Sequence, residues 1–230
     1  MLEEAADAIR FDNRIRVAVL RSEVEGVFCA GADLKERAEM SQTDVQRFVS
    51  AARAFTARIS NLPQPLIAAL DGAALGGGLE FALCCDIRVA ATTARLGLVE
   101  TKLAIIPGAG GTQRLPRLIG ISKAKELIFT GRILNGIEAN NVGLVNQVVE
   151  QNQSGNAAYE EAIKLAEEIL PQGPIALRMA KLAINQGMQV DLTSGLQFEE
   201  GCYSQIIPTT DRLEGLAAFR EKRKPIYRGE

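Results

Sequence analysis

The order of the predicted elements places this chain in the α/β class. Short apolar strands alternate with helices through the first half of the sequence, and helices fill most of the remainder. The 230 residues, 47% of them hydrophobic, are enough for one sizeable core. We find no internal repeat, low-complexity tract or long linker, so the sequence predicts one domain with a helical extension, not two independent domains.

The first quarter contains a helix, a strand, a loop and a second helix. Residues 1–11 space their apolar side chains as a helix does, and residues 15–21 (IRVAVLR) form an apolar strand bounded by charge. Residues 22–36 are rich in turn-forming residues and predict a loop. The helix over residues 41–59 begins at an N-cap candidate, Ser41, and two prolines stop it.

The second quarter contains three strands and two glycine-rich segments. Residues 65–72 (PLIAALDG) form a short apolar strand that runs into three consecutive glycines, Gly76 to Gly78, and a helix. Residues 87–91 and 95–99 read as two further strands. The segment 105–115 (IIPGAGGTQRL) has the composition of a loop.

From Ser122 onward the pattern is helical, except for a strand over residues 143–149 (GLVNQVV). The long helices that the spacing of apolar residues predicts are 157–170, 175–186, 192–205 and 211–223. The last two carry apolar residues beyond what a helical layer packed only on its own domain requires, although a purely intrachain core is an alternative. These residues are Leu192, Leu196, Phe198, Leu213, Leu216 and Phe219.

Charge and hydropathy exclude several kinds of partner. The formal net charge is −2, which gives no reason to expect a polyanion or a membrane surface as partner. No apolar run reaches the length of a transmembrane helix. The acidic start, Met1 to Glu4, resembles neither a signal peptide nor a transit peptide. The chain is therefore expected to be cytosolic, or to rely on a targeting segment outside the given sequence.

The reactive side chains also restrict the chemistry. The four cysteines show no C-x-x-C spacing, which favours a reducing compartment. The chain has no histidine, and this excludes Ser-His-Asp and Cys-His nucleophile systems and the commonest zinc sites. No metal site is predicted. In an enzyme that uses acid–base chemistry, carboxylates, lysine, tyrosine or cysteine must carry the proton.

The glycine-rich segments do not fit a nucleotide site. No G-x-x-x-x-G-K-[ST] motif is present, and PGAGGTQ has Gln113 where a dinucleotide fingerprint needs its last glycine. Glycines at Gly76 to Gly78 would instead let a ligand approach free main-chain N–H groups at a helix start. The loop 28–33 could aim a second N–H at the same place and complete an oxyanion hole. The alternative is a tight strand-to-helix turn with a packing role.

Two of the carboxylates stand out. Glu80 lies in an otherwise apolar helix, and Glu100 follows an apolar strand and precedes a glycine-rich loop. Apolar surroundings raise a carboxyl pKa and suit the group to proton transfer near neutral pH. Spacing alone leaves open the alternative of solvated or hydrogen-bonded carboxylates. Lys35 could reach an anionic ligand or belong to a solvated helix start, and the run 221–224 could likewise meet a phosphate or form a solvated face.

Taken together, these segments resemble the crotonase family, the enoyl-CoA hydratases and isomerases. FCAGADLKE, AALDGAALGGGLEFALCCDIRVA, LGLVETKLAIIPGAGGTQRLPRLIG, AKELIFTGR and LAAFREKRKPIY occur in the family's order and spacing. The resemblance implies an α/β crotonase-like (ClpP/crotonase) spiral of ββα units with a helical C-terminal trimerisation region. It places the core at residues 1–170, without the strand pair and N-A-L segment with which the family normally begins, and the helical region at 171–230.

The resemblance also implies an activity and a site. The chain would be an enoyl-CoA hydratase, a hydro-lyase of the EC 4.2.1 type, that adds water across the C2=C3 double bond of a 2-enoyl-CoA. Glu80 and Glu100 would be catalytic, because they match the two carboxylates of the family's hydratases. Isomerases of the family often keep only one of them, so the presence of both favours hydration. The remaining residues implied are Ala32 and Gly77 in the oxyanion hole, Gly108 as the amide that positions the water, and Ala30, Ala32, Asp33, Leu34, Lys35, Tyr203 and Lys222 at CoA.

Partners and location are implied in the same way. Acyl-CoA would be the substrate, with no separate cofactor and no membrane span, and the chain would assemble as a homotrimer or hexamer in the mitochondrial matrix. Two mitochondrial branches of the family are most similar, one that binds AU-rich RNA and a paralogue of it, and the paralogue is favoured. RNA binding is not expected, because residues 1–16 are acidic where the RNA-binding branch has a comb of lysines. The alternative function is an RNA-binding or scaffold homologue with little or no activity.

Overall fold

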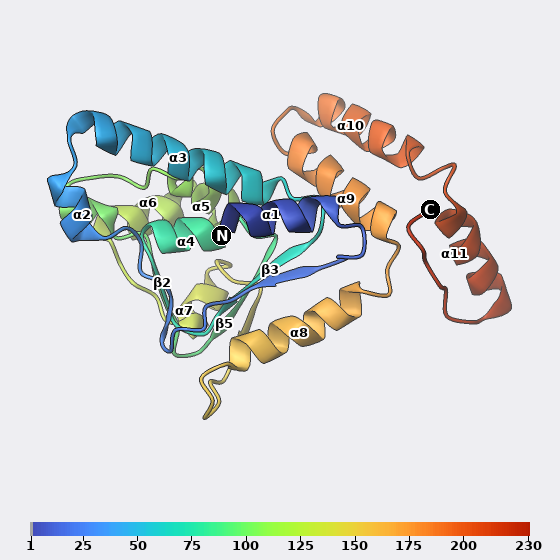
Figure 1. Ribbon diagram of the computed structural model, residues 1–230, viewed down its shortest axis with the longest axis horizontal. Coiled ribbons are helices and arrows are strands. Elements are labelled where there is room, and N and C mark those ends of the chain that lie inside the picture. Colours follow the sequence, from blue (N-terminus) through green and yellow to red (C-terminus); the bar gives the residue numbers. More distant parts are fainter. Residues whose placement is uncertain (1) are drawn as a thin grey trace. The chain divides into compact units, whose positions relative to one another are not determined.

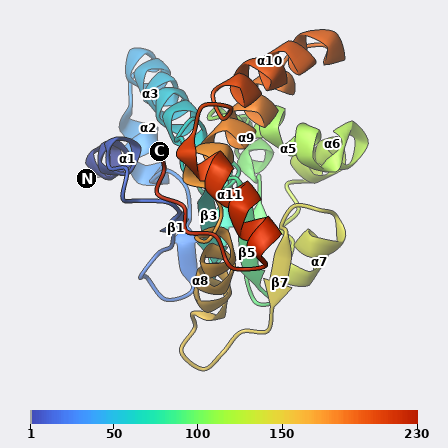
Figure 2. The same cartoon turned by 90° about the vertical axis from the view of Figure 1, so that its right-hand side faces the viewer.

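Consecutive strands of the chain alternate between two sheets. The order is β1-β3-β5-β7 in a four-stranded sheet, whose strands are labelled in Figure 2, and β2-β4-β6 in a three-stranded sheet. The pairs β3–β5, β5–β7, β2–β4 and β4–β6 are all parallel. Each pair of successive strands therefore contributes one strand to each sheet before the next helix, which confirms the predicted spiral of ββα units.

The computed structural model describes residues 2–230, and these form two compact units (Figure 1). The first unit comprises Val19–Asn61 and Leu66–Lys164, and the second comprises the residues up to Ala18, Leu62–Pro65 and Leu165–Glu230. The first unit contains both sheets. The predicted boundary after residue 170 stays a prediction.

The strands of the first unit are β1 (Ala18–Leu20), β2 (Val27–Cys29), β3 (Leu66–Leu70), β4 (Ala73–Leu75), β5 (Ile87–Ala91), β6 (Arg95–Gly97) and β7 (Gln147–Val149). The first residue of β1, Ala18, belongs to the other unit. Its helices are α2 (Leu34–Glu39), α3 (Gln42–Ser60), α4 (Gly77–Ala82), the 3-10 helix η1 (Glu100–Leu103), α5 (Gly111–Ile119), α6 (Ile121–Thr130), α7 (Gly136–Asn141) and α8 (Ala157–Ile169). The last part of α8, from Leu165, belongs to the other unit.

The core of this unit lies along the two central strands of the larger sheet. Every residue of β3 is buried, and four of the five residues of β5 are. The strands pair in register from Ile67 opposite Ile87 to Leu70 opposite Ala90. A parallel sheet is covered on both faces, so its strands read as continuous apolar runs. This is why the sequence predicts both strands correctly.

Two segments predicted as loops contain regular structure. Residues 22–36 include strand β2 and the first turn of α2, and residues 105–115 include the start of α5. Strand β2 has only three residues, too few to show a periodic pattern, and it depends on pairing with β4. Helix α5 begins after Gly110, whose φ of 117° only glycine adopts readily, so a glycine-rich start conceals the helix. The loop predictions are wrong at these places.

The second unit is helical. Its helices are α1 (Leu2–Phe11), α9 (Pro174–Gly187), α10 (Leu192–Ser204) and α11 (Thr210–Glu221), as the sequence predicts. Helices α9 and α10 form a hairpin in which Gly187 and Gly195 bring the two backbones into contact (Figure 1). After α11 the chain returns to that helix, where the buried Asp211 accepts hydrogen bonds from the N–H groups of Arg228 (2.7 Å) and Gly229 (2.8 Å).

Large apolar side chains remain exposed on α10 and α11. They include all six that the sequence analysis singles out: Leu192, Leu196, Phe198, Leu213, Leu216 and Phe219. Within residues 2–230, no helix is both long and apolar enough to cross a membrane.

Candidate active site

The three-stranded sheet brings the glycine-rich segments together at one end. Strands β2, β4 and β6 are parallel, so the segments that follow them leave the sheet at the same edge, where ligands bind in many α/β proteins. A Cβ built on Gly31 would lie 3.0 Å from the carbonyl oxygen of Leu75 and 3.5 Å from the nitrogen of Gly77. The segment after β2 is thus packed directly against the turn that starts α4.

The three consecutive glycines differ in what the structure requires of them. Gly76 caps α4 with φ 54° and ψ −126°, and its N–H donates to the carbonyl of Gly97 at 2.8 Å. A Cβ on Gly78 would lie 1.9 Å from the carbonyl oxygen of Cys29, so only glycine lets the helix pack against β2. Gly77 is exposed, and the nearest atom to a Cβ built on it is the Cα of Gly31 at 4.0 Å. Packing therefore requires Gly78, whereas Gly77 faces open space.

Glu80 is buried and fully hydrogen-bonded at one oxygen. Its side chain comes from α4 and is 3% exposed. Its Oε1 accepts the N–H groups of Ala109 at 2.8 Å and of Gly111 at 2.7 Å, the latter at the start of α5. Two N–H donors, one of them at the start of a helix, therefore fix the position of this carboxylate oxygen.

Glu100 is buried with the opposite surroundings. It opens η1, is 8% exposed, and neither of its carboxylate oxygens has a hydrogen-bond partner within residues 2–230. Burial, and to a lesser extent the nearby charge of Glu80, raises the pKa of Glu100 to about 7. A Cβ on Gly76 would lie 3.4 Å from its Oε1, so this carboxylate lies against the glycine turn. The structure brings the two predicted carboxylates and Gly77 into one neighbourhood.

The other predicted residues fall into two groups. Ala30, Ala32, Asp33, Leu34 and Lys35 follow β2 near Gly77, with Asp33 capping α2 by accepting the N–H of Lys35 at 2.8 Å. Lys35 is exposed. Gly108 precedes Ala109, and its carbonyl accepts a hydrogen bond from Arg53 Nε at 3.3 Å.

Tyr203 and Lys222 belong to the other unit, at an exposed position of α10 and just after α11 respectively. Their role at CoA stays a prediction.

Sequence reasoning missed the groups that surround Glu80. The N–H groups of Ala109 and Gly111 donate to Glu80. Thr56 and Arg114 both donate to the carbonyl of Ala109. These groups come from segments far from Glu80 in the sequence. A threonine in a helix and an arginine after a glycine-rich loop carry no signal that would mark them individually. Only the folded arrangement identifies them.

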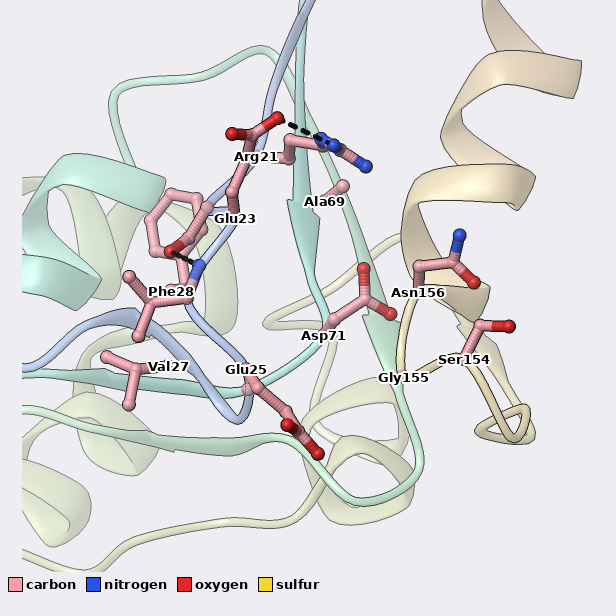
Figure 3. A pocket seen from close by; sticks show the side chains of 13 residues that line it. Arg21, Glu23, Glu25, Val27, Phe28, Ala69, Asp71, Ser154, Gly155 and Asn156 are labelled. Atoms are coloured by element: carbon pink, nitrogen blue, oxygen red, sulfur yellow. Dashed lines mark hydrogen bonds and ion pairs between the residues drawn. The ribbon is translucent and has the colours of Figure 1, made fainter.

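A separate cavity lies at the opposite strand ends. It has a volume of about 270 Å3 and lies among the loops that lead into β2 and β4 and the start of α8 (Figure 3). Three of its charged side chains have hydrogen-bond partners. Arg21 contacts Glu23 at 2.9 Å, and Asp71 points toward α8, where it accepts the N–H groups of Ala158 (2.7 Å) and Tyr159 (3.1 Å). These contacts fix the start of α8 and leave this cavity without the chemistry of the Glu80 site.

Two buried carboxylates, Glu80 and Glu100, lie beside a glycine turn in which Gly77 is exposed. The whole chain, residues 1–230, matches the family model described as enoyl-CoA hydratase/isomerase. The chain belongs to this family, the crotonase family of the sequence analysis. Acyl-CoA is the substrate of these enzymes, which use no separate cofactor.

Named relatives cover the full length of the chain. Methylglutaconyl-CoA hydratase, mitochondrial, of Homo sapiens is 66% identical over 230 residues, which are 100% of this chain and 68% of that protein. Enoyl-CoA hydratase domain-containing protein 2, mitochondrial, of Mus musculus is 58% identical over 229 residues, covering 100% and 77%. The first relative is thus more similar than the second, the paralogue, so the preference for the paralogue is wrong. At this similarity the chain is an enzyme of the hydratase class, as predicted.

A solved structure agrees with the fold. The crystal structure of an enoyl-CoA hydratase from Bacillus anthracis superposes with a TM-score of 0.95 at 54% identity, covering 100% of this chain and 87% of that one. The predicted fold class is confirmed by this match.

Proposed function

We propose that the chain hydrates the C2=C3 double bond of a 2-enoyl-CoA thioester, with Glu80 and Glu100 as its acid–base pair. The observation that carries this proposal is the contrast between the two buried carboxylates. One accepts two N–H hydrogen bonds, while the other accepts none and has a pKa raised to about 7. Carboxyl groups whose surroundings separate their proton affinities are suited to act as base and acid in one reaction.

Glu80 is the proposed general base. Its anionic carboxylate would accept a proton from a water molecule as the water oxygen forms a bond to C3 of the substrate. Gly108 is proposed to orient this water through its amide. The loop that contains Gly108 also donates to Glu80 through the next residue, Ala109, which supports a common neighbourhood for the water and the base.

Glu100 is the proposed general acid. With its pKa near 7, a substantial fraction of Glu100 is protonated at neutral pH and can deliver a proton to C2. The net reaction places hydrogen on C2 and hydroxyl on C3. Afterwards Glu80 holds one proton more and Glu100 one fewer, and exchange with solvent water restores both groups.

The thioester oxygen gains negative charge when water attacks C3. The N–H groups of Gly77 and Ala32 are the proposed donors to this oxygen. The exposure of Gly77 and the contact between its segment and Gly31 support this assignment. Neither N–H has an acceptor among residues 2–230, so both are available to a ligand.

The CoA part of the substrate is proposed to follow the segment after β2. Ala30, Ala32, Asp33, Leu34 and Lys35 would line it, with the Lys35 ammonium available to a phosphate. Tyr203 and Lys222 are proposed to contact CoA held by a neighbouring copy of the chain in a trimer. We also propose a location in the mitochondrial matrix, because the relatives at 66% and 58% identity are named as mitochondrial proteins.

The test is an absorbance assay that follows loss of the enoyl thioester. Methylglutaconyl-CoA is the first substrate to try because of the 66% identical relative, followed by short and long unbranched enoyl-CoAs. We expect turnover by the natural chain and a loss of at least ~10²-fold in kcat for Glu80→Gln and for Glu100→Gln, typical of removing a positioned base or acid. Affinity for a saturated acyl-CoA should change little, because the main-chain donors remain. Failure of the natural chain on every enoyl-CoA would favour the alternative, a scaffold or RNA-binding homologue.

A further inference from the structure

We propose that Arg114 is a positioning residue for Glu80: its guanidinium group holds the 109–111 segment so that two N–H groups converge on the carboxylate. The inference rests on the proposed role of Glu80 as base. Among residues 2–230, Arg114 makes no hydrogen bond to Glu80 or to the proposed oxyanion donors, Gly77 and Ala32, and it acts through Ala109.

Ala109 links the arginine to the carboxylate. Its N–H donates to Glu80 Oε1 at 2.8 Å, while its carbonyl oxygen accepts Arg114 Nη1 at 3.0 Å and Thr56 Oγ1 at 2.8 Å. Both hydrogen-bonding groups of one buried residue are therefore committed, one to the carboxylate and one to its supports. A displacement of Ala109 would lengthen the hydrogen bond to Glu80.

Gly110 leaves free the space that the arginine side chain occupies. Arg114 lies one turn into α5, and helical side chains lean toward the N-terminus of their helix. The guanidinium group folds back over the first turn, where a Cβ on Gly110 would lie 2.0 Å from Nη1. Gly110 also has φ 117°, so both the backbone and the space above it are fitted to the arginine.

The arginine is not needed merely to satisfy a buried carbonyl. Thr56 is buried on α3 and donates to the same oxygen at a shorter distance, so loss of Arg114 leaves Ala109 with a donor. The expected consequence is a shift of the loop and the loss of a nearby cation, rather than an unpaired buried group. This separates a positioning role from a purely structural one.

The charged groups near Glu80 determine which measurements the loss of Arg114 would change. Glu100 on η1 is the neighbouring anion, and Arg114 on α5 and Arg53 on α3 are the cations held by the 108–111 loop. Cys84, in the turn that follows α4, donates to the carbonyl of Glu80, and burial raises the pKa of this thiol to about 11, so it stays neutral. Removing Arg114 leaves Arg53 as the cation that this loop still holds, and it removes one of the two donors to the carbonyl of Ala109.

The experiment compares Arg114→Gln with Arg117→Gln, a matched control. Arg117 lies one turn later on the same helix, is exposed, and bonds only Gln113 in residues 2–230. The first readout is a carbon-13 NMR titration of the Glu80 carboxyl, assigned with Glu80→Gln. The second is the pH profile of kcat. For Arg114→Gln we expect the titration curve of the Glu80 carboxyl and the acidic limb of the kcat profile to differ from those of the natural chain, and kcat to fall about 10- to 100-fold with KM within about 2-fold. Arg117→Gln should match the natural chain.

Two further variants complete the test. Arg114→Lys keeps the charge without the planar fork, and should restore the titration while recovering only part of kcat. Arg114→Met keeps the apolar stem and replaces Arg114→Gln if that variant does not fold. An unchanged Glu80 titration in a folded, uncharged variant overturns the proposal, as does an Arg114→Lys titration that equals that of Arg114→Gln. Because the titration needs no turnover, it decides this inference even if the natural chain hydrates none of the enoyl-CoAs.

Discussion

The carboxylates of Glu80 and Glu100 lie in one neighbourhood with opposite hydrogen bonding. Glu80 accepts two main-chain N–H groups, whereas Glu100 accepts none among residues 2–230. A buried carboxylate without donors binds its proton more tightly, and a neighbouring anion strengthens this effect. The asymmetry arises at the turn before α5, where the N–H groups of Ala109 and Gly111 both donate to Glu80.

The raised pKa of Glu100 predicts the pH dependence of both activity and stability. If Glu100 is the general acid, as proposed, hydration requires its protonated form, so kcat should fall as pH rises through about 7. Stability follows the same sign. Between its ordinary value of 4.5 and about 7, the folded state binds the proton that the unfolded state has lost, so Glu100 makes the fold less stable as pH rises. Glu100→Gln should therefore raise Tm at pH 8 and leave it unchanged near pH 4.

Calorimetry at both pH values checks this prediction. We expect an increase of at least about 2 °C at pH 8, the shift that ~1 kcal/mol gives in a chain of this size. Glu167→Gln, which removes an exposed carboxylate on α8, is the control and should show no pH-dependent difference. An equal change in Tm at pH 4 and pH 8 would mean that the charge of Glu100 is not responsible.

Neighbouring glycines at the start of α4 should respond differently to a methyl group. Gly78→Ala forces a Cβ to within 1.9 Å of the carbonyl of Cys29 and should lower the free energy of unfolding by about 1–3 kcal/mol or more. Gly77→Ala meets nothing closer than 4.0 Å and should fold normally. Its methyl group would enter the space beside the proposed oxyanion donor, and kcat should fall about 10²-fold.

Thermal unfolding and the enoyl-CoA assay on the two variants separate these effects. A folded Gly77→Ala enzyme with normal kcat would remove Gly77 from the proposed oxyanion hole. A stable Gly78→Ala protein would contradict the close approach of α4 to β2.

Some parts of this arrangement can be predicted from the sequence because they depend on local composition. The strands over 65–72 and 87–91 are apolar on both faces, and Glu80 is conspicuous as the charged residue of an apolar helix. The hydrogen-bond partners of Glu80 cannot be predicted from the sequence. They depend on the φ of Gly110 and on the packing of α3 against the 108–111 loop, which join residues about 30 or more positions apart. Long-range contacts of this kind leave no periodic pattern.

The first helix predicts weak and unselective RNA binding. Helix α1 has Glu3 and Glu4 in its first turn and a single basic residue, Arg10, in its last. Phosphate contacts supply most of the affinity for RNA, and a chain of net charge −2 offers few on this helix. We expect AU-rich and unrelated RNAs of equal length to bind equally weakly in filter-binding assays at ~150 mM salt. A selective complex at nanomolar protein would contradict this.

The exposed apolar residues of α10 and α11 predict assembly into a homotrimer or hexamer. Phe219 is 87% exposed and Leu192 78%, and large apolar side chains in contiguous patches mark interaction surfaces. For a chain of 24.8 kDa, light scattering coupled to size exclusion should give about 75 kDa or about twice that. Phe219→Asp should shift the mass toward the monomer, whereas Phe11→Asp, an exposed phenylalanine on α1, should not.

If the trimer forms as proposed, CoA affinity should depend on assembly through Lys222. This lysine follows α11 with φ 53°, an uncommon conformation for a residue other than glycine, and Arg223 beside it is fixed by two hydrogen bonds to Glu214 at 2.6 and 2.8 Å. A lysine held there suits a phosphate of the CoA of a neighbouring copy.

Lys222→Ala should raise the Kd for CoA about 10-fold, the loss of ~1.4 kcal/mol, with kcat within about 2-fold. Calorimetric titration checks this against Arg220→Ala, which removes an exposed charge from the last turn of α11. A stable monomer that binds acyl-CoA as tightly as the assembled chain would show that Lys222 and the trimer have no part in CoA binding.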